Sequence, residues 1–444
     1  MAIFKPLMTI VFLTLIVYLI VWGAFLFSYT PNDTISLIGI IIISTVGLHC
    51  AIKAYNRNIV AILIVAYLAR LGILFLDYNG IPIIHSGADS ETFYRIAVNN
   101  MQLPANSHYY LTNYTVLLTY LFKLVGPQKL FVQYINVLLG MTTLVYTYKS
   151  LRLLEVGKKG VIIAMWILAL MPNQVILSSI LLRESIIIST FTISMYYLLK
   201  WIREGETLSM VLSLFFIVLS SVMHSGMLGV ALGFLIVFAS YQRSSGKLKF
   251  SKRLIVAVPL ALVFIVVLII SGIATSYLNF LLNPDNMSSS EALLEMATTE
   301  SSDAGSAYLV GVNTDSIPKL LLFLPLKILY FLFSPMPWNW RGIGDIISFV
   351  LDSAIILWMF WAIYYPSSKK RPKANPSSRS IVHIIMLGVW ISIAMYSLGT
   401  STAGTAMRHR ANFIPAILVC SILSYEYKSI VKNASSFPTN QKTV

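Results

Sequence analysis

Long, continuous runs of apolar side chains alternate with short polar segments along almost the whole chain. Each run approaches the roughly 20 residues that a helix needs to cross a bilayer, and the in-out alternation of barrel strands is missing. Two shorter apolar stretches, 111–125 and 318–333, predict helices that lie at one membrane surface or dip into it. The longer runs predict about 12 membrane-spanning helices, at residues 7–28, 35–52, 59–77, 132–149, 160–180, 185–201, 208–223, 226–240, 254–272, 345–365, 381–399 and 410–427.

The expected fold class is therefore an all-α, polytopic membrane protein. The composition agrees, because 57% of the 444 residues are hydrophobic and 11% are charged, whereas a soluble domain has about 25% charged residues. The first run is too long for a signal-peptide core and lacks a small-residue cleavage site, so we expect an uncleaved span. Both cysteines, Cys50 and Cys420, lie in apolar runs, and neither a disulfide framework nor a thiolate metal site is expected.

The basic residues predict how the helices are oriented. If the N-terminus is cytoplasmic, most of the 32 Lys and Arg fall in inner segments, as the positive-inside rule requires. The C-terminus is then cytoplasmic as well, and the acidic stretch 273–317 lies outside. The net charge of +15 therefore reflects orientation in a cell membrane, among membrane lipids, and predicts no nucleic-acid partner.

The first outer loop holds two carboxylates, Asp89 and Glu91, just beyond a span. A carboxylate there can act as a general base and take a proton from an acceptor hydroxyl. The pair could instead share a divalent cation, Mg²⁺ or Mn²⁺, that neutralises a phosphate leaving group. The apolar stripe from Phe93 to Met101 predicts a short helix on the bilayer surface, and Asp89 or Ser90 could simply cap it.

Six features follow one another in order between residues 59 and 205. They are the arginine of Tyr67-Leu-Ala-Arg-Leu-Gly72, the Gly87-Ala-Asp-Ser90 motif followed by Tyr94 and Ala97, a half-length apolar helix over 109–126, a span over 134–152 that ends in basic residues, Met171-Pro172 closing the next span, and Arg183-Glu184 opening the one after. This order resembles the GT-C glycosyltransferases, and among them the bacterial enzymes related to protein mannosyltransferases and lipid A aminoarabinose transferases.

The resemblance implies a GT-C-like transmembrane core over 59–430, with outer loops 78–131 and 273–344. Residues 1–58 would then add two N-terminal helices, and 431–444 would form a cytoplasmic tail. The resemblance also implies that Asp89 is the catalytic base and that the donor sugar is carried on a polyprenyl phosphate.

Several polar residues are candidates for the wall of the active-site cavity. Arg70 lies within a span, where a charge should face protein or a cavity; Asp77 could be its partner in a structural ion pair. Arg183 and Glu184 occupy a short outer turn, where they could also be an ordinary headgroup-level pair. The remaining wall candidates are His85, Tyr94 and His224, although a lone histidine such as His224 is more often a packed polar residue.

The last outer loop predicts a phosphate site. Arg408, His409 and Arg410 follow a Gly/Ser/Thr-rich stretch on the side that should be poor in cations. Guanidinium groups bind phosphate bidentately, although interfacial arginines could equally contact lipid headgroups. Arg341 follows the 318–333 stretch and could reach a phosphate, while Trp338 and Trp340 suit an aromatic belt at the interface.

These expectations converge on an integral membrane glycosyltransferase that acts at the outer face. It would move a sugar from a polyprenyl-phosphate-linked donor to a glycan, lipid or protein acceptor, in the synthesis of cell-surface polysaccharide or glycoconjugates. One alternative is a polysaccharide polymerase or an O-antigen ligase-type enzyme that uses undecaprenyl-diphosphate glycans. A second is a transporter or flippase, against which the sequence shows no matching broken spans or inverted repeat.

Overall fold

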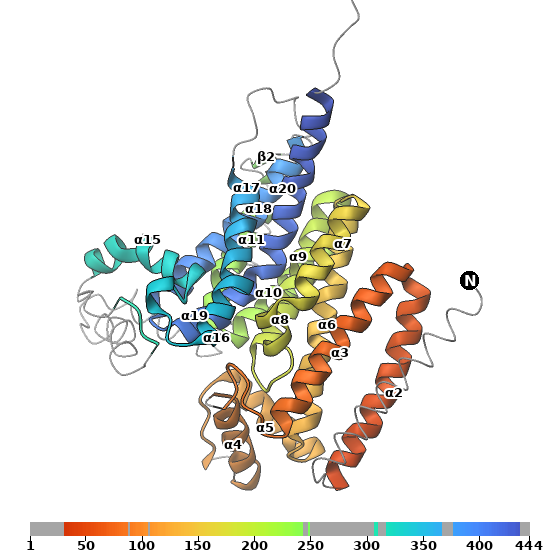
Figure 1. Cartoon of the computed structure of the whole chain (residues 1–444), viewed down its shortest axis with the longest axis vertical. Helices are drawn as coiled ribbons and strands as arrows, with labels where there is room; N and C mark the ends of the chain where they lie inside the picture. Colours follow the sequence, from red (N-terminus) through yellow and green to blue (C-terminus); the bar gives the residue numbers. More distant parts are fainter. Residues whose placement is uncertain are drawn as a thin grey trace, which may run out of the picture. The chain divides into compact units, whose positions relative to one another are not determined.

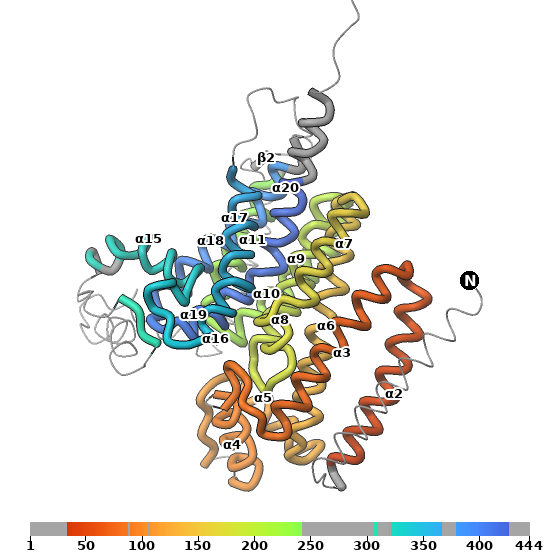
Figure 2. Tube along the Cα trace, in the orientation of Figure 1, coloured from red at the N-terminus to blue at the C-terminus, as the bar shows by residue number. Residues whose placement is uncertain are grey.

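The computed structural model describes residues 31–87, 89–104, 107–242, 247–248, 306–309, 317–365 and 376–435. These residues are almost entirely helical, as the chain trace in Figures 1 and 2 shows. The only strands among them are β1 (Tyr241–Gln242) and β2 (Lys247–Leu248), which form a short antiparallel pair. The expected all-α fold class is therefore confirmed for the described chain. The expected spans at 7–28 and 254–272 lie outside the described residues.

Six described helices are long and apolar enough to cross a membrane. They are α2 (Pro31–Ala54), α3 (Arg57–Tyr78), α6 (Lys129–Leu153), α9 (Glu184–Glu204), the continuous run of α16 (Ile343–Ser348), η4 (Phe349–Ser353) and α17 (Ala354–Tyr364), and α18 (Pro376–Leu398). Three apolar helices are shorter: α10 (Thr207–Met223), the joined η2 (Ser225–Met227) and α11 (Leu228–Ser240), and α15 (Ile317–Phe333). These helices indicate a membrane protein, and the count of 12 spans stays a prediction.

The run predicted as one span at 160–180 is two helices in the structure. α7 (Lys158–Leu170) ends before Met171, and α8 (Pro172–Leu177) begins with the proline. Proline has no amide hydrogen and disfavours the helical conformation of the residue before it. The apolar character of the run predicted its burial correctly but hid the break.

The last predicted span also begins later than expected. Residues of the predicted outer loop form α19 (Ala403–Arg410), which Thr402 caps by accepting a hydrogen bond from the amide of Thr405. A turn of 3-10 helix, η5 (Ala411–Phe413), then leads into α20 (Ile414–Ser435). Arg408, His409 and Arg410 therefore end a short helix and do not begin the last long one.

The chain divides into two compact units. Unit 1 contains the described residues of Met1–Val145 and Met165–Ser189, and unit 2 contains those of Tyr146–Ala164 and Thr190–Val444. The first outer loop lies within unit 1, and the segment 306–309 and α19 lie within unit 2.

Unit 1 is built on an apolar core shared by α2, α3 and the first part of α6. The core side chains are Leu37, Ile40, Leu48, Val60, Tyr67, Leu71, Leu74, Phe75, Leu130, Tyr134 and Val137. α4 (Asp89–Gln102) and α5 (Asn113–Val125) form a helical hairpin, in which Phe93 and Tyr94 meet Tyr114 and Phe122 edge to face. Both short helices predicted for the first outer loop are thus present, and their position at a membrane surface stays a prediction.

Unit 2 is held together by a close contact between α11 and α18. Gly229 of α11 approaches Ser392 so closely that a Cβ atom at position 229 would lie 2.5 Å from the Ser392 amide nitrogen. The amide of Val230 donates a 2.7 Å hydrogen bond to Ser392 Oγ. One turn further on, Gly233 lies directly against Gly388. Small residues four apart let two helix backbones pack this tightly in membranes.

Candidate functional sites

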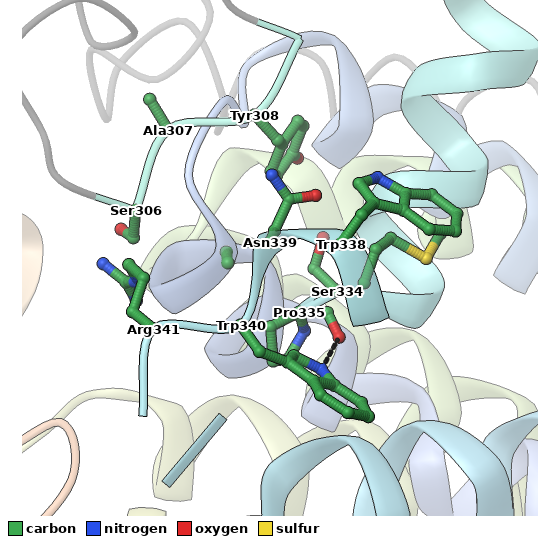
Figure 3. A pocket seen from close by; sticks show the side chains of 11 residues that line it. Ser306, Ala307, Tyr308, Ser334, Pro335, Trp338, Asn339, Trp340 and Arg341 are labelled. Atoms are coloured by element: carbon green, nitrogen blue, oxygen red, sulfur yellow. Dashed lines mark hydrogen bonds between the residues drawn. The ribbon is translucent and has the colours of Figure 1, made fainter. Parts of the chain in front are cut away.

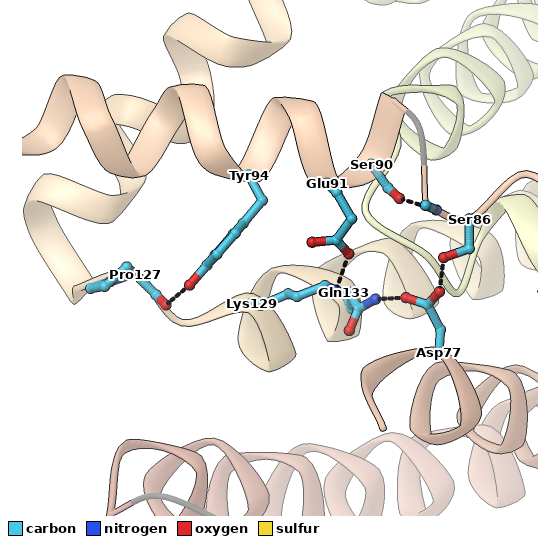
Figure 4. Close-up of polar contacts among 9 residues, drawn as sticks. Asp77, Ser86, Ser90, Glu91, Tyr94, Pro127, Lys129 and Gln133 are labelled. Atoms are coloured by element: carbon cyan, nitrogen blue, oxygen red, sulfur yellow. Dashed lines mark hydrogen bonds and ion pairs between the residues drawn. The ribbon is translucent and has the colours of Figure 1, made fainter. Parts of the chain in front are cut away.

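The first outer loop is anchored at its two sides by polar contacts within unit 1 (Figure 4). The buried carboxylate of Asp77, at the end of α3, accepts hydrogen bonds from Ser86 Oγ and, at 2.5 Å, from Gln133 Nε2 of α6. His85 Nε2 lies 3.1 Å from Asn173 Oδ1 of α8. The backbone of His85 has a φ of 69°, a left-handed conformation that is uncommon for residues other than glycine.

Asp89 is the first residue of α4 and is half-buried. It lies inside the first helical turn, where the helix dipole stabilises a negative charge. Glu91, two residues on, forms an ion pair with Lys129 at the start of α6, and Tyr94 Oη donates a 3.1 Å hydrogen bond to the carbonyl of Pro127 (Figure 4). Glu91 and Tyr94 therefore fasten α4 to the beginning of α6.

The described residues contain no group of three or more His, Cys, Asp or Glu side chains that could hold a metal ion. Asp89 and Glu91 are the only carboxylates predicted from the sequence as ligands, and Glu91 is engaged by Lys129. A divalent cation at this loop stays a prediction.

Arg70 is 1% exposed and binds main-chain and hydroxyl oxygens. Its Nε donates to Ser178 Oγ at 2.9 Å, and its Nη1 donates to the carbonyls of Ala66 and Ala169 at 3.0 and 3.2 Å. The suggested pairing with Asp77 is wrong, because Asp77 is held by Ser86 and Gln133. The break between α7 and α8 instead leaves carbonyls at the end of α7 without helical donors, and a cation is stabilised there.

Glu184 is fully buried at the start of α9. The short connection before it is fixed by Asn136 Nδ2, which donates to the carbonyls of Ile180 and Leu182 at 2.6 and 3.1 Å. Burial raises the pKa of the Tyr114 hydroxyl, and the charge of Glu184 raises it further. Arg183, next to Glu184, is partly exposed.

Unit 2 contains a pocket of about 260 Å³ (Figure 3). It lies where residues 306–309 pair with the segment that precedes α19: the amide of Tyr308 donates to Ser401 O and that of Ala403 donates to Ser306 O, each at 2.9 Å. The lining residues are Ser306, Ala307, Tyr308, Ser334, Pro335, Met336, Trp338, Asn339, Trp340, Arg341 and Ala403.

Three aromatic residues and one arginine are among the residues that line this pocket. Trp338 and Trp340 donate their indole N–H groups to Tyr330 Oη at 3.1 Å and to Pro335 O at 3.2 Å. Arg341 is half exposed, and its Nε donates to Asp345 Oδ2 at 3.3 Å, which orients the side chain. The sequence-based interpretation of the tryptophans as interfacial and of Arg341 as a possible phosphate ligand is compatible with this arrangement.

Arg410 lies behind the pocket wall and is 1% exposed. Its Nη1 donates to the carbonyl of Leu332 at 3.0 Å and to that of the lining residue Ser334. Its Nε and Nη2 are buried and have no hydrogen-bond partner within the described chain. Burial lowers the pKa of Arg410 to about 10, opposed by the negative charge of Asp352, so the side chain is charged at neutral pH.

The neighbours of Arg410 on α19 have different surroundings. The buried ring of His409 meets the ring of His224 edge on, with centroids 4.6 Å apart, and His224 stacks on Tyr396 at 4.5 Å. His224 Nδ1 also accepts a 3.1 Å hydrogen bond from the amide of Gly226. His224 is thus a packed polar residue, as a lone histidine more often is. Arg408 is partly exposed.

The structure assigns the predicted site residues to two groups. Unit 1 holds Arg70, His85, Asp89, Glu91, Tyr94, Arg183 and Glu184; unit 2 holds His224, Arg341, Arg408, His409 and Arg410. Sequence reasoning overlooked several polar residues that fix these sites, among them Gln133, Asn136, Asn173, Asp352 and Tyr308. Gln133, Asn136 and Asp352 interrupt apolar runs, and a polar residue in such a run is a signal that could have identified them.

No protein-family model, no curated protein and no solved structure matches this chain. Its function must therefore be argued from its own residues.

Proposed function

We propose that this protein is an integral membrane glycosyltransferase. It transfers a sugar from a polyprenyl-phosphate-linked donor to a glycan, lipid or protein acceptor at the outer face of the membrane. The observation that carries the proposal is the position of Asp89 as the first residue of α4. The carboxylate begins α4 directly after a loop that Asp77, Ser86 and Asn173 anchor, and preorganisation of this kind is what a catalytic base needs.

The proposed reaction needs one base and one phosphate site. Asp89 takes the proton from the acceptor hydroxyl, whose oxygen attacks the anomeric carbon of the sugar. The bond between that carbon and the phosphate oxygen breaks, and polyprenyl phosphate leaves with the electron pair. Attack opposite the leaving group inverts the anomeric centre. A cation must neutralise the leaving phosphate, and the candidates predicted from the sequence are Arg341, Arg408 and Arg410.

The helix break at Met171–Pro172 does not support the transporter alternative. In transporters, unwound helix ends coordinate the cargo. Here Arg70 donates to Ala169 O and to Ser178 Oγ, so a side chain of the protein itself occupies the break.

The decisive variant is Asp89→Asn, which keeps the size of the side chain but cannot accept the proton. Transfer of radiolabelled sugar from a polyprenyl-phosphate donor, measured with purified protein, should fall by about 10²–10⁴-fold. Glu155→Gln is the matched control, because Glu155 is an exposed carboxylate of a predicted inner segment; its rate should equal that of wild type. A well-folded Asp89→Asn protein that transfers sugar at the wild-type rate would show that Asp89 is not the general base and that its role is limited to the start of α4.

A further inference from the structure

We infer that the pocket of unit 2 binds the sugar-phosphate headgroup of the lipid-linked donor, with Arg341 at the phosphate and Trp340 against the sugar ring. This inference rests on the proposed function and narrows it, because it selects one arginine and one cavity from the several cations predicted as phosphate ligands.

The size of the pocket fits one sugar with its phosphate. Its volume of about 260 Å³ lies just below the roughly 300–1,000 Å³ of typical small-molecule sites. A single ring and one phosphate can enter, whereas the polyprenyl chain must remain outside. The walls come from residues 306–308, from the segment that follows α15, and from Ala403, so backbone and side chains surround the cavity on several sides (Figure 3).

The lining chemistry matches an amphipathic, anionic ligand. The indoles of Trp338 and Trp340 offer flat apolar surfaces, with their N–H groups already bonded to Tyr330 and Pro335, and such surfaces suit the C–H face of a sugar. Asn339 contributes a carbonyl oxygen that is buried and has no hydrogen-bond partner among the described residues. A sugar hydroxyl is a donor that could satisfy it.

Arg341 is better placed than Arg410 to contact the phosphate. The Arg341 side chain is 52% exposed on the pocket lining, and Asp345 orients it through Nε. Arg410 is 1% exposed, and its Nη1 is bound to the carbonyls of Leu332 and Ser334. Arg410 therefore acts as a positioning residue, which holds the Ser334 wall, and Arg341 supplies the fork that recognises a phosphate.

Two ligands separate the two roles. Full-length protein in nanodiscs of neutral lipid is titrated with a short-chain polyprenyl-phosphate sugar and with the same polyprenyl phosphate lacking the sugar. Arg341→Ala should weaken both ligands by about tenfold to a hundredfold, the loss of a charge-assisted contact. Arg341→Lys should recover only part of the affinity. Trp340→Ala should weaken the glycosylated ligand by about tenfold and leave the bare lipid phosphate unchanged.

Matched controls come from the same unit. Arg379 and Trp361 are exposed residues outside the pocket, and their Ala variants should bind both ligands like wild type. Phosphatidylglycerol at equal concentration should not displace the donor. If phosphatidylglycerol displaces the donor, the pocket is a site for ordinary anionic headgroups. If Arg341→Ala and Trp340→Ala both bind the donor with wild-type affinity, the donor binds elsewhere. Either result overturns the inference.

The inference and the proposed function can fail separately. If Arg341→Ala and Trp340→Ala bind the donor and transfer its sugar like wild type, the assignment of the donor site to this pocket is wrong and the proposed transferase activity stands. If the pocket variants lose donor binding as expected but wild-type protein transfers sugar to no acceptor, the pocket stands and the transferase is wrong.

Discussion

Arg70, Lys327 and Arg410 are buried cations that share one task. Each donates to a main-chain carbonyl within the last two residues of a helix: Arg70 to Ala169 of α7, Lys327 to Leu398 of α18 at 2.9 Å, and Arg410 to Leu332 of α15. The last carbonyls of a helix lack intrahelical donors, and the negative end of the helix dipole attracts a cation. These side chains thus complete helices that end inside the protein.

This task explains why sequence reasoning gave Arg70 the wrong partner. The sequence reveals a charge within an apolar run, and a carboxylate such as Asp77 is the obvious candidate to neutralise it. The acceptors in the structure include the main-chain carbonyl of Ala169. Every residue carries such a carbonyl, so the sequence does not indicate which one accepts the hydrogen bond. An acid at the start of a short helix, as for Asp89, could be predicted from the sequence. The side chains that anchor the preceding loop include Gln133 and Asn173, which come from helices distant in the sequence and could not be predicted.

Replacement of Arg410 should destabilise unit 2. Arg410→Ala removes the donor that Arg410 supplies to the carbonyl of Leu332, and a buried carbonyl left unsatisfied costs about 1–3 kcal/mol. The carbonyl of Ser334 also loses Arg410 but keeps a 3.2 Å hydrogen bond from Ser353 Oγ. Thermal unfolding in detergent should show a clearly lowered Tm, and Arg410→Lys should lose less because it retains the charge. Arg152→Ala, at an exposed arginine, is the control. An unchanged Tm for Arg410→Ala would assign Arg410 to a ligand rather than to the fold.

At the scale of the elements, the apolar pattern predicts most helices but not their ends or their pairing. The sequence predicts one span over α7 and α8 because the eleven consecutive apolar residues 161–171 indicate a helix more strongly than the single Pro172 indicates a break. α19 was hidden because Gly, Ser and Thr, which favour loops, also favour the start of a helix. The contact of α11 with α18 depends on small residues whose spacing is too common in membrane helices to identify a partner.

That contact gives a test at this scale. Gly229→Ala adds a Cβ that would meet the backbone of Ser392 at 2.5 Å, and overpacking of this kind costs about 1–3 kcal/mol. The variant should have a lower Tm and should yield less monodisperse protein on size-exclusion chromatography. Gly47→Ala in α2 is the matched control, since nothing lies within 4 Å of a Cβ there. It should be neutral or slightly stabilising, because alanine favours a helix over glycine. Equal effects of the two variants would contradict the close contact.

At the scale of the whole molecule, charge determines the expected orientation. Tyr109, which is 62% exposed, lies in the predicted first outer loop, and the exposed Lys158 lies in a predicted inner segment. With Cys50 and Cys420 replaced, a membrane-impermeant maleimide applied to intact cells should label Tyr109→Cys and spare Lys158→Cys. Both should react after the membrane is permeabilised. The reverse pattern would invert the topology and remove Asp89 from the outer face.

The joint between residues 306–309 and 400–403 has a consequence for how such a pocket could diversify. Its bonds run from the amides of Tyr308 and Ala403 to the carbonyls of Ser401 and Ser306, and nearly every amino acid carries these groups. These backbone hydrogen bonds therefore do not depend on which side chains the two segments carry. Mutation at Ser306 or Trp340 could change which sugar is accepted while the scaffold stays intact, so selectivity could evolve in small steps without a loss of folding.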